Sequence, residues 1–353
     1  MIMGHYRKII DRSGGRRLCL YSREPRYYRH FDGLPEVNSV SPYLRRHPLT
    51  GDWIAIAAAR QQRIFLPNQA ECPFCVMHDG GPLTDIPVDA YEVAVFTNRF
   101  AALSALPDLP PELEVATAPG LGICKVISYS DAHDANLATI GAERISLLIE
   151  AIGAEATDLF QVDGIKYVLP FENRGREIGV TIDHPHGQIY ALSHIPERIE
   201  RQAKAFDDGN PLLDAIDSIA EELVISCNAY GIAFVPEWAR YPFEICVLPF
   251  RRVAYPAEMT GEETAGYAAL LDEVAKKLDA VFEAPMPLTM GWHIAPLGYE
   301  DVFHFHCVFQ PLKRSRTKMK FLAAVEQITG LFLLDLPPEQ AAAILNGLEQ
   351  PDD

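Results

Sequence analysis

Positive charge is scarce in this chain. Its 353 residues include 31 lysines and arginines against 48 aspartates and glutamates, a formal net charge of −17 at pH 7. Because a surface of that sign repels a polyanion, the composition argues against nucleic acid as a partner. A local basic pocket for a phosphorylated metabolite remains compatible with it.

Long apolar runs are missing as well. The sequence contains no stretch of about 18 consecutive apolar residues, which is the length that a membrane-spanning helix needs. The amino terminus MIMGHYRKIIDRSGGRR has neither the apolar core nor the cleavage site of a secretory signal. We therefore expect a cytoplasmic protein without a membrane partner. The hydrophobic content of 48% suffices for one large core or two domains of ordinary size.

Cysteines are few and scattered. Seven in a chain this long do not make a disulfide framework, and only Cys72 and Cys75, in CPFC, are closely spaced. In a reducing compartment a CxxC is either half of a metal site or a redox pair. A redox pair lies between a strand and a helix, whereas this one follows the polar FLPNQAE and precedes the loop-like MHDGGPLTD, so we favour the metal site.

Short β-like runs alternate with amphipathic helices. Asn210 before Pro211 predicts the start of a helix that runs towards Cys227, and Thr260 with Glu263 predicts a capping box. Helical spacing marks one buried face formed by Ile145, Leu148, Ile149 and Ile152. Enrichment in Val, Ile, Tyr and Phe predicts strands at 91–96, 124–129, 167–171 and 187–192.

The order of elements is repeated along the chain. Each half ends in an HxH that enters a strand, IDHPHGQIYAL in the first and VFHFHCVFQPL in the second. This duplication predicts an α+β protein of two related halves, each with a mostly antiparallel sheet flanked by helices. We place the halves at residues 41–196 and 197–353 and expect the arginine-rich residues 1–40 to form a basic peripheral arm.

The stretch IDHPHGQIYA has a chemical pattern of its own. In an extended chain, alternate side chains share a face, so His184, His186 and Gln188 would project together. Gly187 would leave the backbone open to a close ligand. Two neutral imidazoles are costly to bury without a metal, a phosphate or a hydrogen bond. The alternative is a pair of histidines on a solvated surface.

These residues carry a family resemblance. HPHGQ, preceded by FENRG at 171–175 and by CPFC, resembles the galactose-1-phosphate uridylyltransferase branch of the histidine-triad superfamily. The resemblance covers roughly residues 45–339 and implies a histidine-triad-like fold. Further matching segments follow in the family's order: RRHPLTGDWIAIAAARQQR, VFTNRFAAL, ISYSDAH, GWHIAP, FHFHCVF and KFLAAVEQ.

The resemblance implies a zinc site. The matching ligands form an S2N2 set, which suits tetrahedral Zn2+, and a site with four protein ligands is closed, so the ion would be structural. It would tie the CxxC loop to the strands beside the reacting histidine. The four ligands are Cys72, Cys75, His133 and His184.

A second metal, iron or zinc, is also implied, because some bacterial relatives use three histidines and a glutamate. His293, His304 and His306 match the histidines, and Glu200 lies near the point of the carboxylate. Gln202 lies there too and would be a poor anionic ligand. Histidines satisfied within the protein are the alternative.

The resemblance makes His186 the nucleophile. A neutral imidazole nitrogen attacks the α-phosphorus of a nucleotide sugar, expels a sugar 1-phosphate and holds the nucleotidyl group until a second sugar phosphate takes it. The other ring nitrogen needs an acceptor, for which we expect a backbone carbonyl. Gln188 would donate to the phosphoryl oxygens, and HxHxQ is typical of the transferases, whereas the hydrolases carry a further histidine.

A substrate-binding set is implied around this centre. It comprises phosphate-binding arginines, a ribose contact, aromatic walls for the base, polar groups near phosphorus and contacts to the hexose phosphate. Arg99 stands where the family pattern has an acidic residue, so we expect the ribose or base contact to differ. In the same order, the set is Arg60 and Arg63, Asn98, Phe96 and Phe100, Asn173 and Thr181, and Lys320 and Glu326.

The leading hypothesis is an enzyme that exchanges UMP between UDP-glucose and galactose 1-phosphate by a ping-pong route. One alternative keeps the covalent histidine but passes the nucleotidyl group to inorganic phosphate, as an ADP-glucose phosphorylase would, or to another sugar 1-phosphate. An alternative of another class is a zinc-stabilised protein that binds a nucleotide sugar without turnover. The partners would be a UDP-sugar and a sugar 1-phosphate, and the resemblance implies a homodimer.

Overall fold

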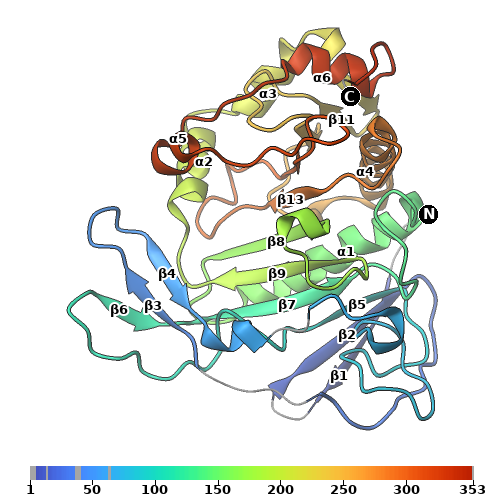
Figure 1. Ribbon diagram of the computed structural model, residues 1–353, viewed down its shortest axis with the longest axis vertical. Helices are drawn as coiled ribbons and strands as arrows, with labels where there is room; N and C mark the ends of the chain where they lie inside the picture. The colour runs from blue at the N-terminus through green and yellow to red at the C-terminus, as the bar shows by residue number, and fades with distance from the viewer. Residues whose placement is uncertain (1–4, 13–14, 36–40, 63–64, 352–353) are drawn as a thin grey trace.

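One antiparallel sheet runs through the whole molecule (Figure 1). The computed structural model describes residues 5–12, 15–35, 41–62 and 65–351. The sheet has eleven strands in the order β1-β2-β5-β7-β9-β8-β13-β14-β12-β11-β10, and each neighbouring pair is antiparallel. The predicted α+β class with antiparallel pairing is confirmed.

The first half supplies six strands: β1 (Tyr6–Asp11), β2 (Arg17–Ser22), β5 (Val93–Thr97), β7 (Gly122–Ser128), β8 (Tyr167–Arg174) and β9 (His186–Leu192). The second half supplies five: β10 (Val224–Asn228), β11 (Gly231–Phe234), β12 (Ile245–Pro249), β13 (Leu288–His293) and β14 (His306–Pro311). A separate antiparallel sheet, in the order β4-β3-β6, consists of β3 (Tyr43–Arg46), β4 (Trp53–Ile56) and β6 (Thr117–Pro119).

The halves meet edge to edge. β8 pairs with β13, with Phe171 opposite Gly291, so the two sheets expected from the sequence form one continuous sheet. The strands then repeat outward from this junction: β9, β7 and β5 follow β8, as β14, β12 and β11 follow β13. Each half therefore presents the same succession of strands, and this succession positions the site described below.

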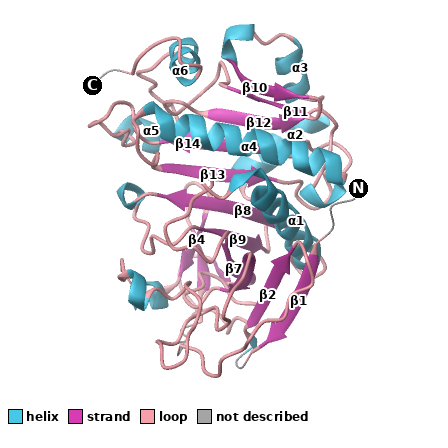
Figure 2. Ribbon diagram, turned by 90° about the vertical axis from the view of Figure 1, so that its right-hand side faces the viewer, coloured by secondary structure: helices cyan, strands magenta, loops and turns pink. Residues whose placement is uncertain are grey.

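Two long helices, α1 (Gly141–Phe160) and α4 (Gly261–Val281), pack against each other on one face of the sheet (Figure 2). α4 begins with the predicted capping box, in which Thr260 Oγ1 accepts from the N–H of Glu263 and the Glu263 carboxylate accepts from the N–H of Thr260. Both helices contribute to the main core. The buried face of α1 includes the residues predicted from their spacing: Ile145, Leu148, Ile149 and Ile152.

The shorter helices are α2 (Glu197–Asp207), α3 (Pro211–Asp217), α5 (Ala324–Thr329) and α6 (Pro338–Leu345). Asn210 caps α3 as predicted, because its side chain accepts from the N–H of Leu213. The helix does not continue towards Cys227, however. Leu223 and Ile225 are both buried at a spacing of two residues, which is the period of a strand, and the chain enters β10.

The amino-terminal segment differs from the peripheral arm expected from its arginines. β2 pairs with β5 inside the main sheet, and four of its residues are buried: Leu18, Cys19, Leu20 and Tyr21. Arg7 forms ion pairs with Glu155 and Asp158 of α1, at 2.9 and 2.6 Å. Arg23 likewise pairs with Glu150 of α1 at 2.6 Å, so two arginines of this segment meet acidic groups of that helix. Within the described ranges, no helix has the length and apolar character needed to cross a bilayer.

Candidate active site

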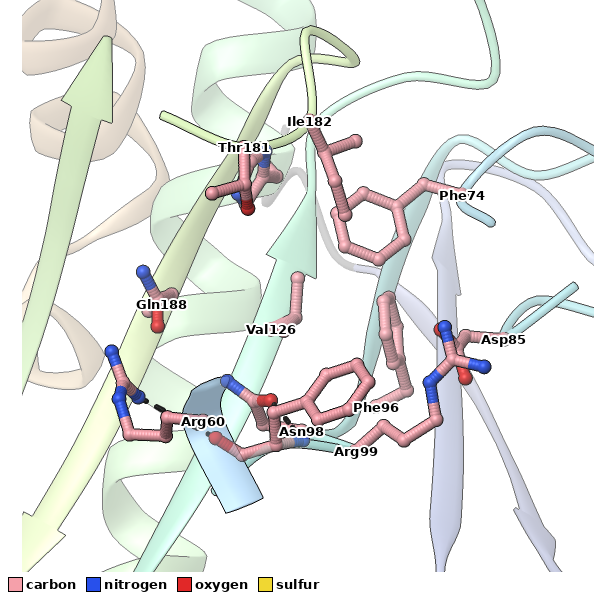
Figure 3. A pocket seen from close by; sticks show the side chains of 12 residues that line it. Arg60, Phe74, Asp85, Phe96, Asn98, Arg99, Val126, Thr181, Ile182 and Gln188 are labelled. Atoms are coloured by element: carbon pink, nitrogen blue, oxygen red, sulfur yellow. Dashed lines mark hydrogen bonds and ion pairs between the residues drawn. The ribbon is translucent and has the colours of Figure 1, made fainter. Parts of the chain in front are cut away.

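A pocket lies on the first half of the sheet (Figure 3). Its floor is a row of directly paired residues, with Phe96 of β5 opposite Val126 of β7 and Val126 opposite Gln188 of β9. Because paired residues of neighbouring strands share a face, all three side chains reach the pocket. Its walls come from Arg60, Phe74, Asp85, Asn98, Arg99, Phe100, Thr181, Ile182 and His186.

His186 opens β9 and presents one ring nitrogen to this pocket. Its Nδ1 lies 2.7 Å from the carbonyl oxygen of His184, and since a carbonyl only accepts, Nδ1 carries the proton. This carbonyl is the backbone acceptor expected for the ring, and it leaves Nε2 with its lone pair. Burial lowers the pKa of His186, so the imidazole is neutral at pH 7. A neutral Nε2 is the form that can act as a nucleophile.

Gly187 faces the opposite side of β9. A Cβ at this position would lie 2.5 Å from the hydroxyl oxygen of Tyr129 and 2.8 Å from the carbonyl oxygen of Phe171. The prediction that Gly187 opens the backbone to a ligand is therefore wrong, since strand alternation turns this residue towards the core. The glycine instead makes room for Tyr129, whose hydroxyl donates to the buried Glu172 at 3.0 Å.

Polar groups stand beside Gln188 and His186. Arg60, on the short 3-10 helix η2 (Ala58–Gln62), donates to the hydroxyl of Tyr190 at 3.0 Å and lines the pocket. Asn98 Oδ1 accepts from the N–H of Phe100 at 2.9 Å, and its Nδ2 has no hydrogen-bond partner in the described part of the chain. These groups offer N–H donors to phosphate and hydroxyl oxygens.

The other side of the pocket holds an ion pair. Figure 3 shows Arg99 and Asp85 across the pocket from Arg60 and Gln188, with Phe96 between them. An Arg99 nitrogen lies 3.5 Å from Asp85 Oδ2, and the guanidinium carbon is 5.1 Å from the ring centroid of Phe100. Arg99 stands where the family pattern has an acidic residue, and its positive charge is compensated by the carboxylate of Asp85.

Sequence reasoning missed four of the pocket residues: Phe74, Asp85, Val126 and Ile182. Asp85 stands in a loop without any motif, so no sequence signal pointed to it. Phe74 could have been found, because it lies between Cys72 and Cys75. Its ring meets that of His186 edge-on, with centroids 5.0 Å apart.

The predicted metal ligands lie together next to the pocket. One ligand atom from each of Cys72, Cys75, His133 and His184 lies within 4.8 Å of the other three. Cys75 Sγ is 3.3 Å from His133 Nδ1 and 3.5 Å from His184 Nδ1, and Cys72 Sγ is 3.7 Å from His184 Nδ1. Bond lengths of about 2.3 Å to sulfur and 2.0 Å to nitrogen place tetrahedral ligands roughly 3.5 Å apart. The four residues therefore fit a metal ion.

His184 is oriented by its second nitrogen. Nε2 lies 2.7 Å from the carbonyl oxygen of Ser130 and 2.9 Å from the hydroxyl of Tyr91, which turns Nδ1 towards the two sulfurs. Burial lowers the pKa of His184 to about 4 and raises the pKa of the Cys75 thiol to about 12. The histidine is thus in its ligating form, and a bound cation would favour the thiolate.

Comparison with known proteins decides the family. Family models of galactose-1-phosphate uridyl transferase match this chain, the N-terminal domain over residues 35–196 and the C-terminal domain over residues 212–352. The chain belongs to the galactose-1-phosphate uridylyltransferase family. The resemblance seen in HPHGQ and CPFC is thereby confirmed, and with it the class of enzyme, a transferase.

Individual uridylyltransferases are similar along nearly their whole length. The galactose-1-phosphate uridylyltransferase of Thermotoga maritima is 36% identical over 320 residues, which cover 87% of this chain and 98% of the relative. That of Streptomyces lividans is 31% identical and covers 93% and 94%. A solved uridylyltransferase structure, 29% identical, has a TM-score of 0.77 and covers 87% and 98%. An ADP-glucose phosphorylase from Arabidopsis thaliana has a TM-score of 0.67 at 22% identity, which shows the fold alone.

Several residues expected at the uridylyltransferase site do not line the pocket. Asn173 lies on β8, two residues beyond Phe171, the last residue that pairs with β9. Lys320 and Glu326 form an ion pair of 2.6 Å in the second half of the molecule. Arg63 lies outside the described residues.

The residues predicted for a second metal site do not form one ligand group in the described part of the chain, and that site stays a prediction. Among the described residues, one cluster alone brings three or more His, Cys, Asp or Glu side chains together at metal-binding distance. This cluster, called the Cys72 group below, is Cys72, Cys75, His133 and His184. Glu200 is 43% exposed and pairs with Lys204. Gln202, and not a carboxylate, faces His293, and its Oε1 lies 3.1 Å from His293 Nδ1.

His304 is turned away from such a site as well. Its Nε2 lies 2.8 Å from the carbonyl oxygen of Pro249, and its Nδ1 is 3.0 Å from Asn210 Nδ2. Both ring nitrogens therefore have partners within the protein. This arrangement matches the alternative of structurally satisfied histidines for His304.

Proposed function

We propose that this uridylyltransferase exchanges UMP between UDP-glucose and galactose 1-phosphate in two displacements at His186. The observation that carries the proposal is the 2.7 Å contact from His186 Nδ1 to the His184 carbonyl, which leaves a neutral Nε2 in a pocket lined by Gln188. Nε2 attacks the α-phosphorus of UDP-glucose, a P–N bond forms, and the P–O bond to glucose 1-phosphate breaks. A phosphate oxygen of galactose 1-phosphate then displaces the imidazole and forms UDP-galactose.

The residues around His186 support each part of this substrate. In both displacements the imidazolium shares its charge with the His184 carbonyl through Nδ1–H, while Gln188 and Arg60 offer donors to the non-bridging phosphoryl oxygens. Asn98 Nδ2 is placed for a ribose hydroxyl. Phe74, Phe96 and Phe100 provide aromatic faces for a planar base.

The Cys72 group is proposed to hold Zn2+. Two thiols and two imidazoles at tetrahedral spacing suit this ion, which when bound would cross-link the loop carrying Cys72 and Cys75 to His133 and His184. With four protein ligands the site has no position for a substrate. Its residues therefore hold the backbone before His186 and take no part in the displacement.

We further propose that the active enzyme is a homodimer with sites shared between copies. Lys320 and Glu326 do not line the pocket of their own chain, yet they match hexose-phosphate contacts of the family. The segment around them exposes apolar side chains, with Phe321 75%, Ile328 82% and Leu331 63% exposed. A second copy that covers these side chains could bring Lys320 to the hexose end of the pocket.

The first experiment is a half-reaction. The protein is mixed with UDP-glucose alone, and released glucose 1-phosphate is measured together with the intact protein mass. We expect one equivalent released and a uridylyl adduct on the peptide that contains His186. Release and adduct with ADP-glucose instead, followed by transfer to inorganic phosphate, would replace the proposal with the phosphorylase. Tight binding without release would replace it with a binding protein.

Shared sites have a test of their own. His186→Ala and Lys320→Ala are expected to be inactive as separate homodimers. The two variants are then mixed under conditions in which subunits exchange between dimers. About half of the dimers become mixed, and one of the two sites in each mixed dimer holds both native residues, so up to about one quarter of the activity should return. A monomer in light scattering, or no recovery despite subunit exchange, would refute shared sites.

A further inference from the structure

The second half of the sheet repeats the active-site pocket position by position. In the first half, a row of paired residues crosses β5, β7 and β9 and forms the pocket floor. In the second half, β11, β12 and β14 pair in the same way. The matching row is Phe234, Cys246 and Val308, in the places of Phe96, Val126 and Gln188.

The HxH geometry is repeated too. His306 Nδ1 lies 2.8 Å from the carbonyl oxygen of His304, as His186 Nδ1 lies 2.7 Å from that of His184. His306 therefore donates through Nδ1 and keeps a lone pair at Nε2. A cavity lies over this ring, roofed by Gln202 of α2.

The groups that handle phosphate and ribose are lost in this copy. Val308 replaces Gln188, so no amide donor stands beside the imidazole. Pro236, two residues after Phe234, replaces Asn98, which is two residues after Phe96. The cavity keeps the imidazole and the aromatic wall, but it lacks the amide donors that stand beside His186 in the first pocket.

A second imidazole is added instead. His293 lies directly opposite His306, and the two rings are parallel, with centroids 4.6 Å apart and an interplanar angle of 5°. His293 Nδ1 faces Gln202 Oε1, and its Nε2 lies over Gly291, where an added Cβ would be 3.3 Å away. Gly291 pairs with Val308, which lines the cavity together with His293 and His306, so Nε2 of His293 lies on the cavity side of the sheet.

An aromatic side chain completes the cavity. Trp238 is 52% exposed, lines the cavity and meets Phe234 edge-on at 6.3 Å. Its loop is fixed by the buried Glu244, whose Oε2 accepts from the N–H of Arg240 at 2.8 Å and of Tyr241 at 3.1 Å. The Arg240 guanidinium also pairs with Glu244 at 3.3 Å, so these two charges compensate each other.

We propose that this cavity binds an uncharged sugar, a free hexose, with two adjacent hydroxyls donating to Nε2 of His293 and His306 and the ring lying on Trp238. Two lone pairs side by side repel a phosphoryl oxygen and accept from vicinal hydroxyls. The indole offers a flat apolar face for the C–H groups of the ring. The site is independent of the reaction at His186.

The test is calorimetric titration of the full-length, metal-loaded protein with D-galactose and D-glucose at millimolar concentrations. We expect saturable binding, one hexose per chain, that is unchanged in His186→Ala and in the presence of excess UDP, which would occupy the first pocket. Trp238→Ala should weaken binding at least tenfold while leaving the midpoint of thermal unfolding unchanged, because this side chain is half exposed. His293→Gln should weaken it as well.

Three outcomes would overturn the site. Absence of hexose binding by the folded wild-type protein is one. Competition by UDP, or loss of binding in His186→Ala, would place the sugar in the first pocket. The third is uptake of a second equivalent of Zn2+ or Fe2+ that disappears in His293→Gln, since these imidazoles would then be metal ligands.

Discussion

His184 and His186 are joined by one contact of 2.7 Å, from the imidazole Nδ1 of His186 to the carbonyl oxygen of His184. The ring of His184 meanwhile faces Cys72 and Cys75 at 3.7 and 3.5 Å. A single residue therefore belongs to the metal group through its side chain and orients the reactive ring through its backbone. Disturbance of the metal group should reach the nucleophile by way of this carbonyl.

Removal of the nucleophile should separate chemistry from folding. His186→Ala is expected to lower nucleotidyl transfer at least about a thousandfold, because no other group can form the covalent intermediate. Metal content and the thermal unfolding midpoint should stay near those of the wild type. His78→Ala is the matched control, since His78 is exposed and belongs to neither site. Preserved turnover in His186→Ala would remove the covalent route.

Loss of one sulfur ligand should act on stability first. Cys75→Ala leaves three of the four ligands, so we expect less zinc by elemental analysis and a lower thermal midpoint, followed by lower activity. Cys227→Ala is the control, because Cys227 is exposed and lies outside the metal group. Full zinc occupancy with unchanged stability would reject the ligand assignment.

Gln188 should matter for turnover more than for binding. Gln188→Ala removes one donor to the phosphoryl oxygens, and loss of such a donor lowers kcat by about 100- to 1000-fold. Gln188→Glu should be worse, because a carboxylate would repel the same oxygens. Steady-state kinetics with both sugar phosphates would show whether kcat or KM changes. A change confined to KM would contradict this role.

Gly187→Ala should destabilise the sheet at the active strand. The added methyl group would meet the Tyr129 hydroxyl at 2.5 Å and the Phe171 carbonyl at 2.8 Å, and overpacking of this kind costs about 1–3 kcal/mol. Urea unfolding measures the loss. In the background of Tyr129→Phe the same substitution should cost less, although the carbonyl contact remains. Equal stability of Gly187→Ala and wild type would show that the strands shift freely.

The capping carboxylate of α4 should contribute a pH-dependent stability. A hydrogen bond from Arg251, with the N–H of Thr260, holds the pKa of Glu263 at about 2, below its ordinary value of 4.5. Its contribution is therefore complete above about pH 5 and is lost as the pH falls towards 2. Glu263→Gln should cost about 1 kcal/mol at pH 7, and the difference from wild type should vanish near pH 2. Arg251→Gln, which removes the charged donor to this carboxylate, should weaken the same trend.

Local chemistry was predictable from the sequence, whereas long-range placement was not. The capping box, the α1 stripe and the spacing within HPHGQ depend on neighbours a few residues apart, so their pattern is visible in the chain. The tetrahedral set of Cys72, Cys75, His133 and His184 came from the family resemblance, and the structure brings the four together.

Other features depend on which segments meet in space. The sequence does not show that β8 pairs with β13, that β2 enters the main sheet, or that Asp85 reaches Arg99. Arginines near the amino terminus suggested a solvated arm because their acidic partners on α1 lie more than a hundred residues away. Glu200 and Gln202 lie on the same helix, α2. Which of them faces His293 depends on how that helix is oriented, and the sequence does not show this.

The junction of β8 and β13 limits how this molecule can be divided. β8 is the edge strand of the first half and β13 that of the second. The backbone N–H and C=O groups along each of these edges are paired with the other half. A half synthesised alone would expose these groups along an open edge, which can recruit any other extended chain and lead to aggregation. The duplicated pocket of the second half is therefore not a detachable module: it exists only as part of a sheet that the catalytic half completes.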